Sequence, residues 1–303
     1  MRWTILLSIA LFLWPPRSYA LWEFGGGARA LGMGGATSAL SDDPGALAAN
    51  PAGIAGQDGL SVLLSSSNYF RGLDDGRSMG YSFIGLVIPT SIEMIKVGIS
   101  VENFNAGDLY EEVSALAAIG MRMEIGKGSL NLGADVRVRR WDSAAVVAET
   151  GEELEHLRGK WTPSFDLGLV WRPGGSTSFG LVFGDLGGFD MSSGKGEEEK
   201  IPFFFKIGFY HEVFGFGLSL DTSVKQGIPS IYVGSERWIA NGRAGLRAGL
   251  AFLDVSQGTN MSFGITLVPY QKPKVSMNYS YSHPIGTLID VGGIHRIDIL
   301  FKF

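Results

Sequence analysis

Segments of roughly ten residues, in which apolar side chains alternate with small or polar ones, fill the chain from about residue 60 to its end. Successive side chains of a β-strand point to opposite faces of the sheet, so each segment has one apolar and one polar face. Residues 130–138 illustrate the pattern, with Leu130, Leu132, Ala134, Val136 and Val138 on one face and Asn131, Gly133, Asp135 and Arg137 on the other. Gly, Asn, Asp and Pro turns separate the segments, and the sequence therefore predicts an all-β protein.

The number of segments and the contrast between their faces predict a membrane barrel. About fourteen strands are expected, and they start near Leu60, Met79, Ile92, Glu111, Ser129, Thr162, Thr177, Ile201, Phe214, Ser230, Gly242, Asn260, Lys274 and Asp290. A soluble sandwich would have shorter strands and would not keep charged residues along one face of nearly every strand. A closed barrel in a bilayer presents its apolar face to lipid and its polar face to the lumen. Closure also pairs every backbone N–H and C=O, so we expect a transmembrane antiparallel up-and-down β-barrel over residues 60–303.

The connections between the segments alternate in length. Brief turns occur at 89–91, 126–128, 173–175, 240–242 and 269–273, and longer polar stretches lie between them at 71–77, 103–110, 142–160, 187–200, 254–259 and 283–289. Outer-membrane barrels have short periplasmic turns and longer external loops. Only 227–229 is short where a long loop is expected.

Composition and motif searches exclude several other classes of protein. The chain has no cysteine, so disulfides and thiolate metal sites are ruled out. Its pI of about 5.5 argues against a nucleic-acid partner. The four histidines, at 156, 211, 283 and 295, show no metal-ligand spacing, and no G-x-S-x-G motif is present. We therefore expect a protein that is not an enzyme and that uses no metal or cofactor.

The first twenty residues resemble a signal peptide. A single Arg2 precedes an apolar run from Trp3 to Trp14, and the segment ends in Ser18-Tyr19-Ala20, a small-x-small cleavage pattern. The apolar run is shorter than the roughly 20 residues that span a bilayer. Export by the Sec route with cleavage after Ala20 is the expectation.

The chain ends on an apolar alternation with a terminal aromatic residue. Ile297, Ile299 and Phe301 lie on one face of the last predicted strand, and Phe303 closes it. This ending resembles the signal that the outer-membrane barrel assembly machinery recognises, which adds that machinery and outer-membrane lipid to the expected partners.

Residues 21–59 lack the strand alternation and are rich in Gly and Ala. They contain G-A-R-A-L-G-M-G-G-A at 27–36, then Asp42-Asp43-Pro44, then Asn50-Pro51-Ala52-Gly53. This pattern resembles the N-terminal signature of the PorV/PorQ family, which is itself similar to FadL-type channels for hydrophobic compounds. The ending Gly-Gly-Ile-His-Arg-Ile at 292–297 also resembles the last strand of that family.

The resemblance implies a fourteen-stranded outer-membrane barrel with an N-terminal hatch inside the lumen, at residues 21–59. Gly and Ala suit a compact plug because they let backbones approach closely. The residues expected to form the hatch and its gating motif are Gly32, Gly34, Gly35, Asp42, Asp43, Asn50, Pro51 and Gly53. Asp42 and Asp43 have two interpretations, a cation site or the cap of a turn or short helix after Pro44.

Charged residues of both signs fall on the predicted inner face. The lumen-facing set of interest is Asp135, Arg137, Arg139, Asp166 and Arg247, within a longer series of Lys96, Glu102, Lys206, Asp221, Arg243, Arg296, Asp298 and Lys302. Mixed charges favour structural pairing with one another and with a plug over a selective ion pore.

Two functions from different classes fit the sequence. The first is a FadL-like barrel in the outer membrane of a Gram-negative bacterium, which passively transports or binds hydrophobic or amphiphilic compounds. The alternative is a PorV-like component of type IX secretion, which binds cargo or translocon proteins without transporting small molecules. No sequence feature separates the two.

Overall fold

A computed structural model describes residues 25–40, 42–69, 79–107, 109–143, 157–193, 200–253, 258–285 and 292–303. The expected signal peptide at residues 1–20 and most of the longest loop lie outside the described residues. Among the helices that the structure describes, none has the length and apolarity needed to cross a membrane.

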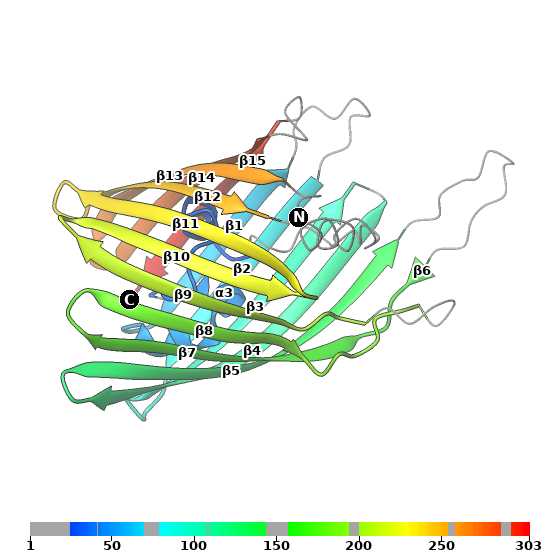
Figure 1. The fold of residues 1–303 in the computed structure, drawn as a ribbon, viewed down its shortest axis with the longest axis horizontal. Coiled ribbons are helices and arrows are strands. Elements are labelled where there is room, and N and C mark those ends of the chain that lie inside the picture. The colour runs from blue at the N-terminus through cyan, green and yellow to red at the C-terminus, as the bar shows by residue number, and fades with distance from the viewer. Residues whose placement is uncertain are drawn as a thin grey trace, which may run out of the picture.

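A single antiparallel sheet of fifteen strands makes up most of the fold (Figure 1). Its strands are β1 (Ser61–Tyr69), β2 (Met79–Pro89), β3 (Ile95–Ala106), β4 (Tyr110–Ile125), β5 (Gly128–Ser143), β6 (Leu157–Arg158), β7 (Thr162–Gly174), β8 (Thr177–Leu186), β9 (Phe204–Val213), β10 (Phe216–Lys225), β11 (Ile228–Ile239), β12 (Ala244–Phe252), β13 (Thr259–Gln271), β14 (Lys274–Ile285) and β15 (Ile294–Lys302). The pairings β1–β15 and β4–β5 close the sheet into a barrel. The two-residue strand β6 only extends the edge of β5, so the barrel wall has fourteen strands and the predicted fold is confirmed.

The two faces of the strands divide as the alternation predicted. In β10, Leu218 and Leu220 are exposed on the outside, whereas Ser219 and Asp221, which alternate with them, are buried. The outer surface therefore carries the large apolar side chains, and the lumen receives the polar ones. Three strands start three or more residues later than predicted: β3 at Ile95, β9 at Phe204 and β15 at Ile294. In the first case, Thr90 Oγ1 donates to the carbonyl oxygens of both Ile92 and Ile95, so Ile92 belongs to the turn.

The connections alternate in length around the barrel. Short turns join β2 to β3, β4 to β5, β7 to β8, β9 to β10, β11 to β12 and β13 to β14 at one end, which we call the short-turn end. The start of β1 and the end of β15 lie at this same end, where the Phe303 N–H donates to the carbonyl oxygen of Leu60. At the other end, the long-loop end, two connections are short: residues 107–109 between β3 and β4, where a longer stretch was expected at 103–110, and the Gln226-Gly227 turn between β10 and β11. Gln226 and Gly227 both have positive φ, as a tight hairpin turn requires.

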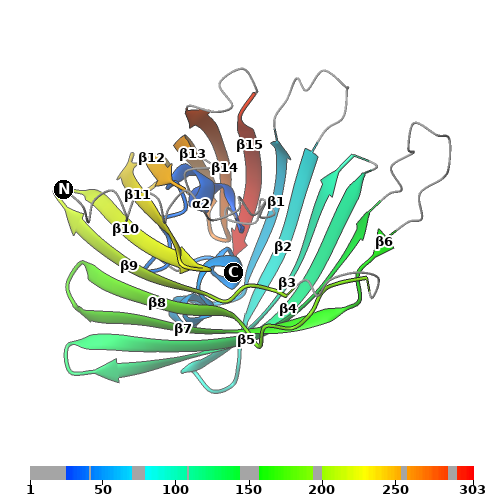
Figure 2. The same ribbon diagram turned by 45° about the vertical axis from the view of Figure 1, so that its right-hand side comes forward.

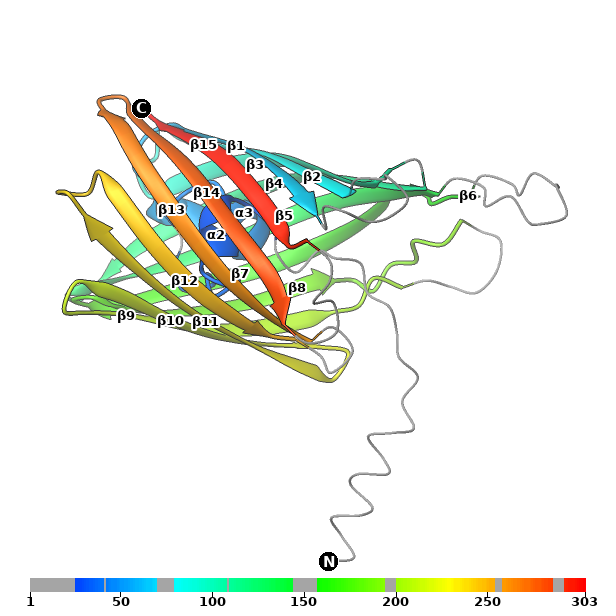
Figure 3. The ribbon, with the colours of Figure 1, turned by 90° about the horizontal axis from the view of Figure 1, so that it is seen from above.

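Residues 25–40 and 42–59, which we call the internal segment, lie inside the barrel (Figures 2 and 3). They form α2 (Ala28–Gly32), α3 (Ala46–Ala49) and the 3-10 helix η2 (Pro51–Gly56). Leu31, Leu47 and Ile54 belong to one buried apolar cluster with Phe83 and Leu116 of the wall. The internal segment therefore supplies much of the apolar core of a barrel whose own inner face is polar.

Candidate functional site

Asn50 fixes the turn between α3 and η2. Its backbone is extended, and its Oδ1 accepts a hydrogen bond of 3.1 Å from the Ala52 N–H, which caps η2. Its Nδ2 donates to the carbonyl oxygens of Ser38 at 2.7 Å and Leu169 at 3.2 Å. Pro51 follows at the first position of η2, where its missing N–H costs nothing. The completely buried Asn50 side chain thus joins two parts of the internal segment to strand β7.

Glycines on the inner face of the barrel let the internal segment approach the wall. Ten strands each carry one such glycine, and we call them the wall glycines: Gly85, Gly98, Gly120, Gly133, Gly168, Gly180, Gly208, Gly234, Gly249 and Gly264. A Cβ atom at Gly133 would lie 2.2 Å from the backbone nitrogen of Ala52, and one at Gly249 would lie 2.2 Å from that of Gly34. Real Cβ atoms do not approach so closely. Only glycine fits these two positions without moving the internal segment.

The wall glycines neighbour one another across the sheet. Gly133 of β5 is opposite Gly120 of β4 on one side and Gly168 of β7 on the other. Gly180 and Gly208 are likewise opposite each other, as are Gly234 and Gly249. The glycines therefore form a band around the lumen at the level where the internal segment crosses it. The sequence analysis missed this band, although the signal was present as glycine at inward positions of alternating strands.

Two of the glycines expected in the hatch motif, Gly32 and Gly34, lie against this band. Gly34 and Gly35 have φ of 63° and 86°, a region that favours glycine. A Cβ atom at Gly34 would lie 2.7 Å from the Leu250 nitrogen, and one at Gly32 would lie 3.1 Å from the Gly264 Cα. Gly53 is buried within η2.

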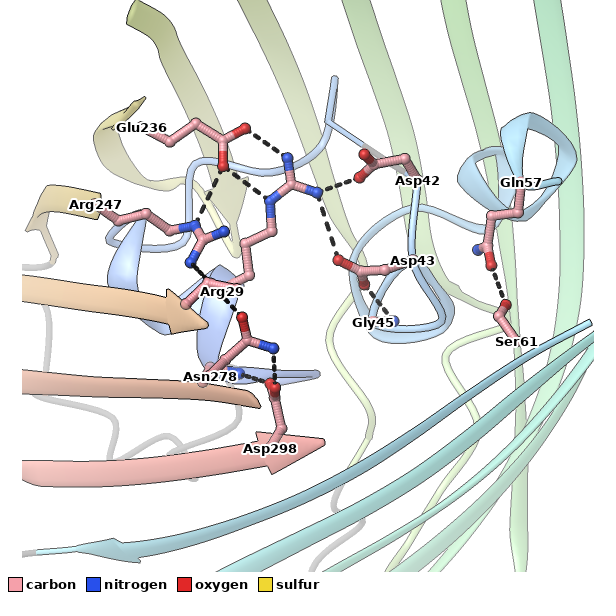
Figure 4. Close-up of polar contacts among 12 residues, drawn as sticks. Arg29, Asp42, Asp43, Gly45, Gln57, Ser61, Glu236, Arg247, Asn278 and Asp298 are labelled. Carbon is pink, nitrogen blue, oxygen red and sulfur yellow. Dashed lines mark hydrogen bonds and ion pairs between the residues drawn. The ribbon is translucent and has the colours of Figure 1, made fainter. Parts of the chain in front are cut away.

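Arg29 connects the internal segment to itself and to the wall (Figure 4). Its Nε and Nη2 donate to the two carboxylate oxygens of Glu236 at 3.1 and 2.5 Å. Its Nη1 pairs with Asp42 and lies 3.5 Å from Asp43. Asp43 Oδ1 also accepts a hydrogen bond of 2.8 Å from the Gly45 N–H, which closes the turn before α3. Asp42 and Asp43 therefore share one nitrogen of the guanidinium, and Glu236 binds the other two.

Burial and charge act in opposite directions on this ion pair. Burial lowers the pKa of Arg29, but Asp42 and Glu236 outweigh it and hold that pKa well above its ordinary value. Burial raises the pKa of Asp42, but Arg29 and then Lys302 outweigh it and lower that pKa. The Asp42 side chain is 55% exposed, and that exposure is to the interior of the barrel. Both groups are charged at neutral pH.

A chain of polar side chains continues from Glu236 to α2. Arg247 Nε donates to Glu236 at 3.2 Å, and Arg247 Nη1 donates to Thr266 at 2.5 Å. Thr266 bonds to Asn278, Asn278 to Asp298, and Asp298 accepts from the Ala28 N–H at the start of α2. Arg247 thus lies in the lumen. It acts on the internal segment through Glu236, which binds both Arg247 and Arg29.

The other lumen residues of interest form a cluster on β3, β5, β7 and β8. Arg137 donates to Glu102 at 3.1 Å and to the Leu47 carbonyl oxygen at 3.4 Å. Arg139 pairs with Asp185 at 2.5 Å. Asp166, which Arg137 approaches at 3.8 Å, accepts a hydrogen bond of 2.7 Å from the Asp185 N–H. Asp135, directly opposite Asp166, is buried, and neither of its carboxylate oxygens has a partner among the described residues.

A β-bulge interrupts the wall beside this cluster. Phe165 is opposite Leu186 and Leu167 is opposite Phe183, so Gly184 and Asp185 of β8 face a single residue of β7. Asp185 has a positive φ of 56°, and its N–H bonds to the Asp166 side chain instead of the ladder. The wall therefore departs from regular pairing two residues from Gly168, where the internal segment touches β7.

Further wall residues, not among those expected to form the gating motif, hold the internal segment. Arg296 is fully buried and donates from Nη1 to the Gly26 carbonyl oxygen at 3.2 Å. Lys206 Nζ donates to the Gly35 carbonyl oxygen at 2.7 Å. Where the segment joins β1, the hydroxyl of Ser61 donates to Gln57 Oε1 at 2.6 Å (Figure 4). All these bonds go to the internal segment. The sequence pattern alone does not show which strand each part of that segment lies against, so these contacts could not be predicted.

The expected assembly-signal residues occupy the end of the barrel wall. Ile297 and Ile299 lie in β15, on its outward face, as does Phe301. Phe303 follows the strand and is exposed. Within the described residues, no three His, Cys, Asp or Glu side chains form a group that could hold a metal ion.

Comparisons with known proteins identify the fold. No protein-family model matches the chain, and no curated protein sequence matches it either. Among solved structures, it is similar to a Pseudomonas aeruginosa FadL homologue with a TM-score of 0.64 and 14% identity, over 92% of this chain and 98% of that one. It is also similar to CymD, a monoaromatic hydrocarbon channel, with a TM-score of 0.67 and 14% identity over 94% and 99% of the two chains. The toluene transporter TbuX of Ralstonia pickettii gives 0.63 and 12%, over 92% and 99%.

These likenesses show a FadL-like outer-membrane barrel fold. Such a fold fits the outer membrane of a Gram-negative bacterium. The similar structures are transport channels for small molecules rather than enzymes.

Proposed function

We propose that this chain is an outer-membrane channel through which hydrophobic or amphiphilic compounds diffuse, and that residues 21–59 act as its hatch. In this proposal the first 20 residues are a signal peptide, and the short-turn end faces the periplasm. FadL-type channels and toluene transporters with this fold support the assignment of class. The residues proposed for gating are those around Asn50 and those bound to Arg29.

The band of wall glycines is the observation that carries the proposal. A purely structural barrel would fill its lumen with side chains, as small barrels do. Here the wall instead has glycines at one level, and a separate segment fills the space there with its backbone and a few of its side chains. Such a segment closes the lumen, and the wall keeps its own closed hydrogen-bond ladder when that segment moves. This arrangement suits a hatch.

The bulge at Asp185 suggests where a compound would leave the lumen. An outward path through the wall must cross the strand ladder, and this ladder is interrupted opposite Asp166. The bulge lies beside the contact between the internal segment and β7. We propose that movement of the hatch there opens a lateral path for apolar compounds.

Uptake of a neutral aromatic probe in proteoliposomes tests the proposal. The substitutions Gly133→Ala and Gly249→Ala each add a methyl group 2.2 Å from hatch backbone, and we expect them to displace the hatch and raise toluene uptake severalfold. Gly80→Ala is the matched control, because its methyl group would meet only the Asn105 side chain, at 3.2 Å. Heat-modifiable migration of each variant on a gel establishes that the barrel has formed.

Unchanged toluene uptake in folded Gly133→Ala and Gly249→Ala barrels, at the level of Gly80→Ala, would contradict the proposed gating. Absence of uptake above protein-free liposomes in every variant would contradict the channel itself.

The PorV/PorQ-like motif of the internal segment supports a second candidate function, in which the barrel binds secreted or translocon proteins. The motif includes Arg29, which binds Glu236, and Asn50, which binds the carbonyl oxygens of Ser38 and Leu169. A double substitution Asn50→Ala and Pro51→Ala separates the two functions. Under the channel proposal, it changes the uptake of hydrophobic compounds. Loss of protein secretion with unchanged uptake of every compound tested would favour the secretion component.

A further inference from the structure

A buried carboxyl group without a hydrogen-bond donor lies on the inner face of β5. Asp135 is 4% exposed, and neither of its carboxyl oxygens accepts a hydrogen bond from the described residues. Asp166 of β7 is directly opposite it in the ladder. Residues in this relation have Cβ atoms about 4.5–5.5 Å apart, so the two carboxyl groups lie within reach of each other.

Asp166 has the contacts that Asp135 lacks. Its Oδ1 accepts a hydrogen bond of 2.7 Å from the Asp185 N–H, and its Oδ2 lies 3.8 Å from Nη2 of Arg137. Hydrogen-bond donors and a nearby guanidinium favour the charged form of a carboxyl group, whereas burial without a donor favours the neutral acid. Of the two, Asp166 is therefore the better placed to hold a negative charge.

The charged groups around Asp135 come from four strands. They are Glu102 of β3, Arg137 and Arg139 of β5, Asp166 of β7 and Asp185 of β8. Strand β4 places the apolar Ala118 opposite Asp135, and α3 and η2 contain no charged residue. With Asp135 ionised, this buried cluster would hold four carboxylates and only two guanidinium groups.

Both guanidinium groups of the cluster already have partners. Arg137 donates to Glu102 at 3.1 Å, and Arg139 pairs with Asp185 at 2.5 Å. Each attracts Asp135 electrostatically, but neither forms a hydrogen bond with it. A neutral Asp135 reduces the excess of negative charge and can donate its proton to Asp166.

Arg137 connects this cluster to the internal segment. Its Nη2 donates to the Leu47 carbonyl oxygen of α3 at 3.4 Å, longer than the usual range of roughly 2.7–3.2 Å, and its buried Nε has no hydrogen-bond partner among the described residues. Arg137 also follows Asp135 at the next inward position of β5. A negative charge on Asp135 would attract the guanidinium and draw it away from Leu47.

We propose that Asp135 carries a proton at neutral pH, which it donates to Asp166, and that loss of this proton in alkaline solution releases the hatch. Gly133 and Gly168, the next inward residues of β5 and β7, both touch the start of η2, so the charge appears directly beside the hatch. Arg137 then leaves Leu47, which frees α3. This regulation rests on the proposed function, because the hatch described there is the part that it moves.

The infrared spectrum of the purified barrel tests the proton directly. A neutral carboxyl group has a carbonyl band that a carboxylate lacks, so subtracting the spectrum of Asp135→Asn from that of the wild type isolates Asp135. We expect this band at pH 7 and its loss as the pH is raised to 10. Asp58→Asn, which replaces an exposed carboxyl group, is the matched control and should give no such difference at pH 7.

Conductance in planar bilayers tests the coupling to the hatch. We expect the wild-type conductance to rise at least threefold between pH 7 and pH 10, with its midpoint at the pH where the infrared band is half lost. Asp135→Asn cannot ionise and should keep its neutral-pH conductance over this range, whereas Asp58→Asn should follow the wild type. Asp166→Asn keeps the test decisive if Asp135→Asn fails to fold, because loss of the neighbouring charge should lower the pH of both transitions by about one unit or more.

Absence of the Asp135 band at pH 7 would overturn the proposed proton. An equal alkaline rise in conductance in Asp135→Asn and the wild type would overturn its link to the hatch. Toluene uptake separates these results from a failure of the proposed function. Normal uptake without the band would refute the proton alone, whereas absent uptake at every pH would refute the channel, and the infrared band would still decide the state of Asp135.

Discussion

Asp221 of β10 accepts two hydrogen bonds from Ser38, one of 2.9 Å from the backbone N–H and one of 2.6 Å from the hydroxyl. The same carboxylate lies 3.2 Å from Lys206 Nζ, which itself donates to the Gly35 carbonyl oxygen. Strand β10 lies between β9 and β11, which each carry a wall glycine, but β10 itself carries none. The completely buried carboxylate of Asp221 holds the internal segment at this interruption of the band.

Replacement of Asp221 should loosen this part of the internal segment. In Asp221→Ala, Lys206 keeps its charge in a largely buried site without its carboxylate, and such a loss costs about 3–5 kcal/mol. We expect a decrease of that size in the free energy of unfolding, measured by urea titration in detergent. Ser219→Ala, at the next inward position of the same strand, is the control and should cost about 1 kcal/mol. Equal losses in the two variants would show that Asp221 has no anchoring role.

The Arg29–Asp42 pair should make closure of the barrel depend on acidity. Because the pKa of Asp42 is lowered below its ordinary value of 3.8, the pair contributes its full stability above that value. The contribution is lost as the pH falls through the lowered pKa of the folded state. We therefore expect conductance in planar bilayers to stay constant from pH 7 to about pH 4 and to rise in more acidic solution.

Two variants isolate the contribution of Asp42 to this pH response. Asp42→Asn should raise the conductance at neutral pH and weaken the response below pH 4, whereas Asp58→Asn, an exposed carboxyl outside the pair, should behave as the wild type. An identical acid response in Asp42→Asn and the wild type would assign the effect to another group.

Arg296 should be needed for the first turn of the internal segment. Besides Gly26, it binds Ser67 Oγ at 2.5 Å and Tyr69 OH at 3.0 Å, and its guanidinium lies 4.8 Å from the centre of the Tyr81 ring. Arg296→Leu leaves these buried acceptors without their donor, at a cost of about 1–3 kcal/mol for each. We expect the temperature at which the folded band disappears from gels to fall by several degrees. Arg243→Gln, at an exposed position, is the control and should leave this temperature unchanged. An unchanged temperature in Arg296→Leu as well would show that the guanidinium is dispensable.

The bulge in β8 offers a test of the lateral path. Deletion of Asp185 leaves Gly184 as the single residue opposite Asp166 and allows regular pairing between β7 and β8. We expect toluene uptake to fall at least fivefold while the barrel still folds. Asp185→Gly keeps the bulge, because glycine accepts the positive φ, and should retain uptake although it loses the Arg139 ion pair. Unchanged uptake in the deletion variant would mean that compounds leave the barrel elsewhere.

The sequence was sufficient for the barrel because strand alternation is a local signal. Leu218, Ser219, Leu220 and Asp221 need no distant partner to show which face meets lipid, and turn residues mark where each strand ends. The predicted starts of strands were less accurate where apolar residues such as Ile92 lie in a turn.

The contacts of the internal segment could not be predicted in the same way. The pattern shows that Gly133 points inward, but not that the backbone of Ala52, far away in sequence, lies against it. The Asp185 bulge depends on a side chain of the neighbouring strand. Each of these features depends on a pairing between distant residues.

The wall glycines also determine what kind of force holds the barrel shut. Interlocking side chains would have to change rotamer or unpack before a plug could leave, which makes release slow and dependent on shape. Where the wall meets backbone, as at Gly133 and Gly249, there is no such obstruction. Discrete polar bonds, such as those of Asp221, Arg296 and Asn50, therefore contribute to the barrier to release, beside the packing of Leu31, Leu47 and Ile54. The opening threshold of this barrel can be changed one polar residue at a time, without altering the fit between the wall glycines and the backbone.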